Sequence, residues 1–405
     1  MSEWKKVKLK DCCHSISDGD HLPPPKSDSG VPFVTIANID ATNHIDFGNT
    51  MFVPYEYYNN LNDIRKAKFN DILYSVVGSF GKPVLIKENK SFAFQRHIAI
   101  LRPNNEFVDS RFLYYVMLSR DFYMQADTVA IGAAQRTISL TALRNMEVEL
   151  PSMDIQHRIA TILSRYDSLI ENYQKQIKLL EEAAQRLYKE WFVDLHFPGH
   201  ENTKIVDGVP EGWEKKKISD ICQTVGGGTP STKVAEYYDD GNIKWVTPTD
   251  ITRSNCLCLF DTDKKITEDG LAHSSAKILP PETILMTSRA SVGYFGIYDC
   301  EVCTNQGFIS CIPNERSYQM YMLYNLMNRV EEIRQKAGGS TYLEISKSVF
   351  RDFDIVLPSC MVLETFQEQS HKMLDCMRQI AKQLRLLTEA RDRLLPKLMS
   401  GAIEV

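Results

Sequence analysis

Two long stretches of the chain carry apolar residues at alternating steps of three and four, which is the spacing of a heptad seam. The first covers residues 155–191 and has one four-residue slip between Tyr173 and Ile177; the second covers residues 363–398, with polar exceptions at Ser370 and Arg391. Each predicts a helix of about 35 residues and roughly 50 Å. A single run would fit an ordinary helical hairpin. Two matched runs favour a pair of helices that pack on each other as an antiparallel coiled-coil spacer.

The stretches before each predicted helix have short alternating patterns that indicate strands, joined by connections rich in glycine and proline. The second half repeats the first at a shift of about 210 residues. In the best block, residues 132–151 align without a gap to residues 339–358, so that Gln135 falls opposite Tyr342. Further upstream, the alignment places Gln95 opposite Gln306. The sequence therefore predicts an α/β (mixed α+β) fold, in which one unit is used twice and a long helix follows each copy.

These patterns divide the chain into five segments. Domains are expected at residues 1–150 and 213–357, helical segments at 151–197 and 358–405, and a linker rich in glycine, proline and asparagine at 198–212. A chain of 405 residues is long enough for each domain to bury its own core.

Net charge and cysteine content indicate how the protein can bind DNA and in which compartment it is expected. The net charge is −5, and residues 1–150 hold 17 basic and 17 acidic side chains, so neither this domain nor the whole chain is basic. If it binds DNA, a partner is expected to neutralise many of the phosphates. Ten cysteines without a disulfide-framework spacing, no apolar run of about 18 residues and no apolar leader at the start predict a cytoplasmic protein that is not bound to a membrane.

Catalytic motifs do not emerge from the sequence. The glycines at 226–228 lack the lysine of a phosphate-binding loop, and no Asn/Asp-Pro-Pro-aromatic tetrapeptide of an amino-methyltransferase is present. Two Glu-x-Lys triplets, at 88–90 and 214–216, show how often that nuclease-like pattern occurs by chance. Cys256, Cys258, Cys300 and Cys303 can be drawn as a zinc site, but their loose spacing favours buried thiols. We expect no catalytic residue, metal ion or cofactor in this chain.

Recognition is the remaining type of function. Polar and basic side chains stand at glycine-flanked loop positions, and Arg, Lys, Gln and Asn are the types that read base edges in the major groove. The candidates for DNA binding are Ser79, Lys82, Gln95, Arg96, Gln135 and Arg136 in the first domain and Lys233, Ser288, Arg289, Asn305, Gln306, Ser340 and Tyr342 in the second. Taken singly, each also fits an ordinary turn residue, and Gln95 and Gln306 also fit a role in holding neighbouring backbone.

A series of short motifs follows in a specific order: Gly228-Thr229-Pro230-Ser231, Lys244-Trp245-Val246-Thr247, Thr304-Asn305-Gln306 and Gly338-Gly339-Ser340-Thr341, with Trp191-Phe192-Val193-Asp194 and Leu394-Leu395-Pro396-Lys397-Leu398 at the helix ends. In this order, and over essentially its full length, the chain resembles the specificity subunit of type I restriction–modification systems. The first domain departs from the pattern, with Asp18-Gly19-Asp20 and Phe94-Gln95-Arg96 at the matching places.

The resemblance implies two target-recognition domains that each read one half of a split site on double-stranded DNA. It also implies that the helical spacer docks two copies of a methyltransferase subunit, which would carry S-adenosylmethionine and methylate adenines. Whether restriction subunits, with ATP and Mg²⁺, join the complex stays open. The two domains align only faintly, so their half-sites are expected to differ.

Two rival functions are an enzyme that acts on DNA without partners and a coiled-coil scaffold with no DNA role. Methyl transfer by the purified chain alone would favour the first. Normal methylation after deletion of residues 1–150 would favour the second.

Overall fold

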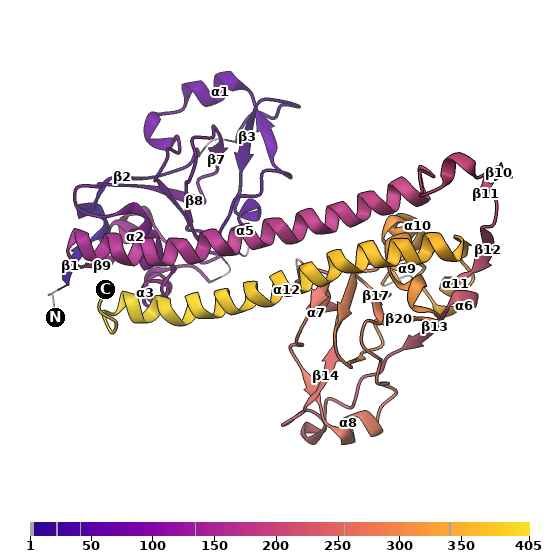
Figure 1. Cartoon of the computed structure of the whole chain (residues 1–405). Helices are drawn as coiled ribbons and strands as arrows, with labels where there is room; N and C mark the ends of the chain where they lie inside the picture. Colours follow the sequence, from indigo (N-terminus) through magenta and orange to yellow (C-terminus); the bar gives the residue numbers. More distant parts are fainter. Residues whose placement is uncertain (1–3, 22, 41, 134, 255, 340–341) are drawn as a thin grey trace. The chain divides into compact units, whose positions relative to one another are not determined.

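The computed structural model describes residues 4–405 except 22, 41, 134, 255, 340 and 341 (Figure 1). The chain forms two compact units. Unit 1 combines Met1–Ile170 with Leu387–Val405, and unit 2 covers Glu171–Leu386. The two long helices, α5 (Met153–Phe192) and α12 (Cys360–Met399), each contribute to both units. The predicted seams at residues 155–191 and 363–398 fall inside these helices.

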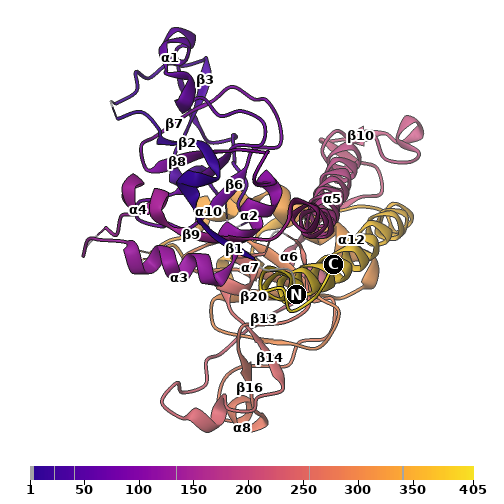
Figure 2. The ribbon, with the colours of Figure 1, turned by 90° about the vertical axis from the view of Figure 1, so that its left-hand side faces the viewer.

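Unit 1 holds domain 1, which we define as the described residues of 4–150. Its helices are α1 (Tyr55–Asn60), α2 (Ser110–Leu118), α3 (Arg120–Val129) and α4 (Leu140–Asn145), with short 3-10 turns at Leu9–Asp11, Ile36–Asn38 and Asp63–Arg65. Its strands are β1 (Lys5–Lys8), β2 (Cys13–Asp18), β3 (Val31–Val34), β4 (Met51–Val53), β5 (Ile72–Ser75), β6 (Pro83–Leu85), β7 (Ala93–Phe94), β8 (Ile98–Pro103) and β9 (Glu147–Leu150). They form the sheets β2-β8-β5-β6 and β4-β3-β7 and the pair β1-β9, and this pair lies next to the start of α5 (Figure 2).

Unit 2 holds domain 2, the described residues of 213–357. Its helices are α6 (Ile218–Ile221), α7 (Pro248–Thr252), α8 (Glu268–Ala272), α9 (Gln319–Asn328), α10 (Val330–Lys336) and α11 (Lys347–Arg351), with 3-10 turns at Ala235–Tyr237 and Arg316–Tyr318. Its strands are β12 (Glu214–Lys217), β13 (Cys222–Gly226), β14 (Ile243–Val246), β15 (Cys258–Leu259), β16 (Lys265–Ile266), β17 (Ile284–Thr287), β18 (Phe295–Tyr298), β19 (Cys303–Thr304), β20 (Phe308–Pro313) and β21 (Asp354–Leu357). The linker before them contains the turn His200–Asn202 and the hairpin β10 (Ile205–Val206) to β11 (Val209–Pro210).

The sheets of domain 2 repeat those of domain 1. Strands β13-β20-β17-β18-β15, β16-β14-β19 and β12-β21 form its sheets, so the first four strands of the large sheet, the three-stranded sheet and the outer pair all have counterparts in domain 1. Hydrogen bonds repeat as well. The Ser75 hydroxyl donates to the carbonyl of Ser79, and the Thr287 hydroxyl donates to that of Ser291. The predicted use of one unit twice is therefore visible in strand order and in individual bonds.

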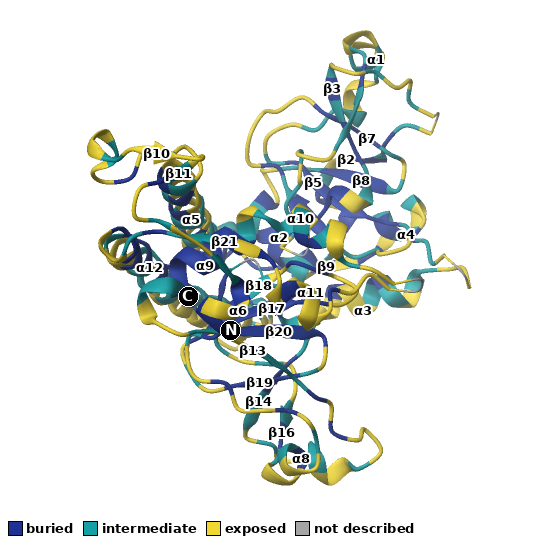
Figure 3. Cartoon of the chain, turned by 90° about the vertical axis from the view of Figure 1, so that its right-hand side faces the viewer, coloured by how far each residue is buried: buried dark blue, intermediate teal, exposed yellow. Residues whose placement is uncertain are grey.

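In each unit the long helices complete the domain core. In unit 1, Ile159 and Leu163 of α5 and Leu398 of α12 belong to one buried cluster with the sheet. In unit 2, Trp191 of α5 and Phe366 of α12 share a cluster with α9, which is coloured as buried over most of its length in Figure 3. A narrow apolar stripe on a helix is stable in water only when it is covered in this way.

A buried glutamine joins each domain to its long helix. The side-chain oxygen of Gln156 on α5 accepts a hydrogen bond from the backbone N–H of Asp109 at 3.0 Å. The side-chain oxygen of Gln367 on α12 likewise accepts one from the N–H of Met320, also at 3.0 Å. Both amides lie at the start of a domain helix, where backbone donors have no partner within the helix.

Replacement of Gln367 by alanine is expected to lower the free energy of unfolding by about 1–3 kcal/mol, because the buried Met320 amide loses its acceptor. Urea unfolding of the full chain measures the loss. The matched control is Gln369→Ala, an exposed glutamine two residues along the same helix, which should change stability by less than about 0.5 kcal/mol. Equal losses in both variants would contradict this role of Gln367.

Candidate nucleic-acid interface

Domain 1 has a cavity of about 330 Å³ at the edge of its large sheet, where four segments of the chain meet, one of them Val76 and Val77 after β5. Asp18 from the end of β2, Arg96 from the turn after β7, and Gln135 and Thr137 from the loop before α4 line it. Two of the predicted DNA-binding residues, Arg96 and Gln135, therefore lie together. They come from segments about 40 residues apart in the sequence.

The Arg96 side chain is exposed and forms no ion pair among the described residues. The acidic group of the same cavity, Asp18, is instead held by His21 at 2.8 Å and by Arg65 at 3.8 Å. An arginine beside a carboxylate would normally pair with it. Because Asp18 is already engaged, the guanidinium of Arg96 keeps its donors available for a ligand.

The turn that carries Arg96 is fixed through its backbone. The N–H of Arg96 donates to the carbonyl of Asp20 at 3.2 Å, and the Asp20 carboxylate accepts from the Tyr57 hydroxyl at 2.7 Å and from Arg65 at 3.2 Å. Burial and this bond to Asp20 raise the pKa of the Tyr57 hydroxyl, so it stays a donor. The neighbouring Gly19 packs so closely that a Cβ there would stand 2.1 Å from the carbonyl oxygen of Phe94.

Domain 2 has the same turn. Gly227 matches Gly19, because a Cβ there would stand 2.0 Å from the carbonyl oxygen of Thr304. The N–H of Asn305 donates to Val246 as that of Gln95 donates to Val34.

Asn305 is therefore the counterpart of Gln95, and Gln306 is the counterpart of Arg96. The pairing of Gln95 with Gln306 in the repeat alignment is wrong by one residue, whereas the motif comparison, which sets Phe94-Gln95-Arg96 against Thr304-Asn305-Gln306, has the right register. The reason for the error is that the shift between the copies varies with loop length: it is 212 residues at Ser75 and Thr287 and 210 at Gln95 and Asn305.

The two residues of the domain 2 turn have different surroundings. The side-chain oxygen of Asn305 accepts from the N–H of Gly307 at 2.8 Å, which holds the turn. Gln306 is exposed, and its side-chain oxygen accepts from the Thr229 hydroxyl. That bond orients the amide, whose NH₂ group is a donor. Arg96 and Gln306 thus present different donors from the same place in the two copies.

A second loop is also shared. Bridges join Ile131 to Thr137 in domain 1 and Gly338 to Glu344 in domain 2. Gly132 and Gly339 both have positive φ, and a Cβ at each would stand 2.6 Å from the carbonyl oxygen of Gln135 and 2.1 Å from that of Tyr342, respectively. The predicted pairing of Gln135 with Tyr342 is confirmed, and Tyr342 is 60% exposed.

Several other predicted residues are engaged in holding the fold. Lys82 donates to the carbonyl of Ile39 at 3.4 Å, and Arg136 pairs with Asp127 and lies over the ring of Phe80. Ser288 is only 3% exposed, and Arg289 lies 3.7 Å from Glu344. Gln95 is half-buried, Ser79 and Lys233 are exposed, and Ser340 lies outside the described residues. The residues that combine exposure with a loop position shared by both copies are Arg96, Gln135, Gln306 and Tyr342.

Two arginines outside the predicted set brace this region. Arg144 of α4 donates to the carbonyl of Ile16 at 2.6 Å, and Arg351 of α11 donates to that of Thr224 at 3.0 Å. Each fastens the short helix that follows the second shared loop to the first strand of the large sheet. The signal was present, because the two arginines fall opposite each other in the aligned block of residues 132–151 and 339–358.

The cysteines of the proposed zinc alternative have other contacts. The Cys258 thiol donates to the carbonyl of Leu374, and the Cys300 sulfur lies 3.1 Å from the Lys244 ammonium. Among the described residues, no group of three or more His, Cys, Asp or Glu side chains is arranged to hold a metal ion. No helix in the described part of the chain is long and apolar enough to cross a membrane.

Comparison with known families gives a repeated match. The profile of the type I restriction modification DNA specificity domain matches residues 1–182 and again residues 210–393. The chain belongs to this family. The match confirms the resemblance noted from the motifs and the tandem arrangement of two similar domains with long helices. A chain of this family is a specificity subunit, whose role is recognition rather than catalysis.

Relatives of this DNA specificity family include the HindI specificity subunit of Haemophilus influenzae, which is 24% identical over the full length of both chains. The MjaIX specificity subunit of Methanocaldococcus jannaschii is 38% identical over 153 residues, a match that covers 37% of this chain and 35% of that protein. The crystal structure of an S subunit from M. genitalium has a TM-score of 0.63 at 17% identity, covering 98% of this chain and 96% of that one. This last likeness supports the fold.

Gly339→Ala should destabilise the chain by about 1–3 kcal/mol and displace the loop that carries Tyr342. Its φ of +133° is unfavourable for alanine, and the new Cβ would clash with the Tyr342 carbonyl. Gly338→Ala is the control, since a Cβ there meets nothing within 4 Å. Thermal unfolding of the full chain compares the two variants. If Gly338→Ala lowered the unfolding temperature as much as Gly339→Ala, the shared loop geometry would be wrong.

Proposed function

We propose that this specificity subunit reads an asymmetric, bipartite site on double-stranded DNA, with domain 1 on one half and domain 2 on the other. The observation that carries the proposal is the shared turn, which presents Arg96 in domain 1 and Gln306 in domain 2. A long helix shared by both units is suited to hold two such readers at a fixed separation.

The side chains suggest which bases are read. Arginine donates two hydrogen bonds to O6 and N7 of guanine, and glutamine pairs with N6 and N7 of adenine. We therefore propose a guanine contact for Arg96 and an adenine contact for Gln306. Gln135 and Tyr342, on the second shared loop, would contact neighbouring bases or the backbone. Of the remaining candidates, Ser79, Lys233 and Arg289 are proposed as phosphate or sugar contacts.

Partner subunits are needed for chemistry and for much of the affinity. The net charge of −5 makes strong binding of the bare chain to DNA unfavourable. On the long helices, Leu169 in unit 1 is 44% exposed, and Leu179 and Leu386 in unit 2 are 52% and 60% exposed, so each unit offers apolar side chains suited to docking another protein. We propose that two methyltransferase subunits, which carry S-adenosylmethionine, dock there in the cytoplasm. Restriction subunits with ATP and Mg²⁺ are compatible with this arrangement but are not needed for recognition.

The proposal excludes independent catalysis by this chain. If the purified chain alone transferred methyl groups from S-adenosylmethionine to DNA, the enzyme alternative would replace it. If methylation continued unchanged after deletion of residues 1–150, a scaffold role would replace it.

Arg96→Ala should relax specificity at one position of the first half-site. The free energy of binding to DNA with the correct base at that position should become less favourable by about 1–3 kcal/mol. The second half-site should stay unchanged. Sequencing of methylated adenines in a host that expresses the complete methyltransferase measures the motif. Arg120→Ala is the control, because Arg120 is exposed on domain 1 and does not line the cavity. An unchanged motif in the Arg96 variant would remove this residue from the readers.

The second prediction tests the spacer. Insertion of four residues between Leu179 and Ala184 lengthens α5 by about 6 Å, close to two base-pair steps of ~3.4 Å, and repeats the slip already present between Tyr173 and Ile177. The motif should keep both half-sites and gain one or two unread base pairs, with weaker methylation because the second half-site also rotates.

The control for the spacer is the same insertion after Gly208. This residue lies in the exposed turn between β10 and β11, with nothing within 4 Å of a Cβ placed there. The control should leave the spacing unchanged. New half-site sequences at the old spacing, from the α5 insertion, would show that this helix does not set the distance.

A further inference from the structure

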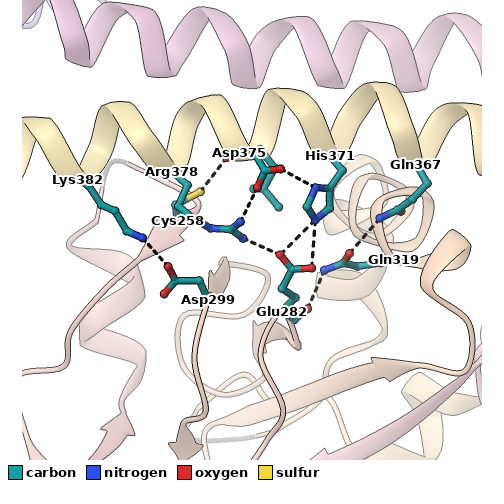
Figure 4. Close-up of polar contacts among 10 residues, drawn as sticks. Cys258, Glu282, Asp299, Gln319, Gln367, His371, Asp375, Arg378 and Lys382 are labelled. Carbon is teal, nitrogen blue, oxygen red and sulfur yellow. Dashed lines mark hydrogen bonds and ion pairs between the residues drawn. The ribbon is translucent and has the colours of Figure 1, made fainter.

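In unit 2, α12 presents a polar stripe to domain 2 (Figure 4). Gln367, His371, Arg378 and Lys382 are separated by four, seven and four residues, so they share one face of the helix. Each contacts domain 2: Gln367 bonds to α9, His371 and Arg378 bond to Glu282, and the Lys382 ammonium lies 2.8 Å from Asp299. The attachment of the domain to this helix therefore includes charged contacts as well as the apolar cluster.

Glu282 is the centre of this stripe. Its carboxylate lies 3.1 Å from Nε2 of His371 and 2.9 Å from Nη2 of Arg378. Asp375, on the same helix, lies 3.1 Å from Nδ1 of His371 and 2.6 Å from Nη1 of Arg378. The side chains of His371 and Arg378 are only 14% and 13% exposed, so solvent screens these contacts much less than it would on the surface.

The backbone at Glu282 is also unusual. This residue has φ +66° two positions before β17, a conformation that favours glycine. Its N–H donates to the carbonyl of Tyr298 at 2.8 Å. A residue with a side chain persists in this conformation when its surroundings hold it there. Here the surroundings are a strand on one side and the side chains of His371 and Arg378 on the other.

Domain 1 lacks this network. The counterpart of Glu282 is Asn70, which has φ +69° and whose N–H donates to Ile86. The shift of 211 residues between Gln156 and Gln367 places Ala160 opposite His371, and Ala160 is fully buried in the apolar cluster of unit 1. Domain 1 therefore rests on α5 through apolar contacts at the position where domain 2 uses charges on α12.

We propose that Glu282 is a positioning residue that fixes domain 2 on α12, and that protonation of His371 tightens this attachment, so that the placement of domain 2 responds to pH. The attachment itself follows from contacts within unit 2. Its consequence for DNA recognition rests on the proposed function.

The charges around His371 support uptake of a proton. Glu282 faces it from the turn before β17, and Asp375 faces it from α12. A cavity beside His371 is lined by further charged groups, from the turn before α9 and from α12: Glu315, Arg316, Glu364, Glu368 and Lys372. The nearest groups are carboxylates, and the hydrogen bond to Glu282 raises the pKa of His371. In return, the bond to His371 and the neighbouring Arg378 lower the pKa of Glu282 to about 2.

The sign of the pH dependence follows from these two shifts. The stabilisation of the attachment by protonated His371 is fully present below the unfolded pKa of the histidine, about 6.5. It is lost as the pH rises through the raised pKa of His371 in the folded chain. The stabilisation of the attachment by ionised Glu282 is present above the unfolded pKa of the carboxylate, about 4.3. It is lost only as the pH falls towards the folded pKa of about 2. The attachment should therefore be strongest between about pH 5 and 6.5 and weaken above neutrality.

Hydrogen exchange of the full chain at pH 6.0 and 8.5 tests the proposal. The amide of Met320 donates to Gln367 of α12, so its protection factor reports the attachment directly. In the wild-type chain this factor should fall roughly fivefold to tenfold from the lower to the higher pH. His371→Gln should remove the pH dependence. Glu282→Gln should lower protection about tenfold at pH 6.0 and also remove the dependence, because His371 loses its partner.

Two controls distinguish an effect on the attachment of domain 2 from effects elsewhere in the chain. His157→Gln removes a histidine of α5 in unit 1 that lies 3.5 Å from Asp109 of domain 1, and the Met320 protection factor should retain its wild-type pH dependence in this variant. Amides of β8 in domain 1 should keep their protection in every variant. If His371→Gln kept the wild-type pH dependence, or if Glu282→Gln left Met320 as protected as before, the proposal would be overturned. Loss of protection across the whole of unit 2 in Glu282→Gln would also overturn it, because the effect would then be general destabilisation.

Methylation by the assembled complex tests the consequence of this attachment for DNA recognition. The ratio of rates on two DNA substrates, with the native spacer and with one extra base pair, should fall at pH 8.5 relative to pH 6.0. In His371→Gln the ratio should be low at both pH values. An altered exchange pattern with an unchanged ratio would leave the attachment standing and would contradict the spacer role of α12.

Discussion

The structure depends on burial of the apolar stripes of two long helices, which neither helix can cover alone. In unit 2, the ring of Phe366 on α12 is fully buried and lies 4.9 Å from that of Phe192, 5.8 Å from that of Trp191 and 6.3 Å from that of Tyr188, all on α5. Each such side chain contributes about 1.5–3 kcal/mol when buried. Because the same cluster contains α9 and the sheet, the helices and the domain share one core. A recognition domain built in this way cannot move far along its helix without exposing that core.

The two domains share this backbone arrangement but differ in the side chains that their matching loops expose. The turn after β7 and β19 keeps its backbone bonds and its close glycine, yet it carries Arg96 in one copy and Gln306 in the other. The loop held by Gly132 and Gly339 behaves in the same way. The backbone geometry of these loops therefore does not depend on which hydrogen-bond donor they carry. One fold can in this way present different side chains to different DNA sequences.

The sequence predicted the features that depend on periodicity. The heptad spacing indicated both long helices, and the ungapped block correctly paired Gln135 with Tyr342. Features that depend on contacts distant in sequence were missed. Arg391, a polar exception in the second seam, is an example, because it pairs with Asp167 at 3.0 Å. The partner of Arg391 lies 224 residues away.

The same limit applies to the candidate site. Lys82 and Arg136 have the right chemistry for DNA, but Lys82 donates to Ile39 and Arg136 pairs with Asp127, contacts that no local pattern reveals. Gln95 was paired with the wrong residue because the shift between the copies changes by a few residues from loop to loop. Arg96 could be proposed from its type and position. That it stays available, because His21 and Arg65 hold Asp18, required the structure.

The central claim is that one chain places two unlike readers at a fixed separation on DNA. The most direct measurement is single-molecule sequencing of DNA methylated by the complex that contains this chain. The account predicts one motif made of two different half-sites, separated by a constant run of roughly 5–8 unread base pairs, since two readers on one face of the duplex stand about one helical turn apart. A palindromic motif, a single contiguous site or a variable gap would contradict it.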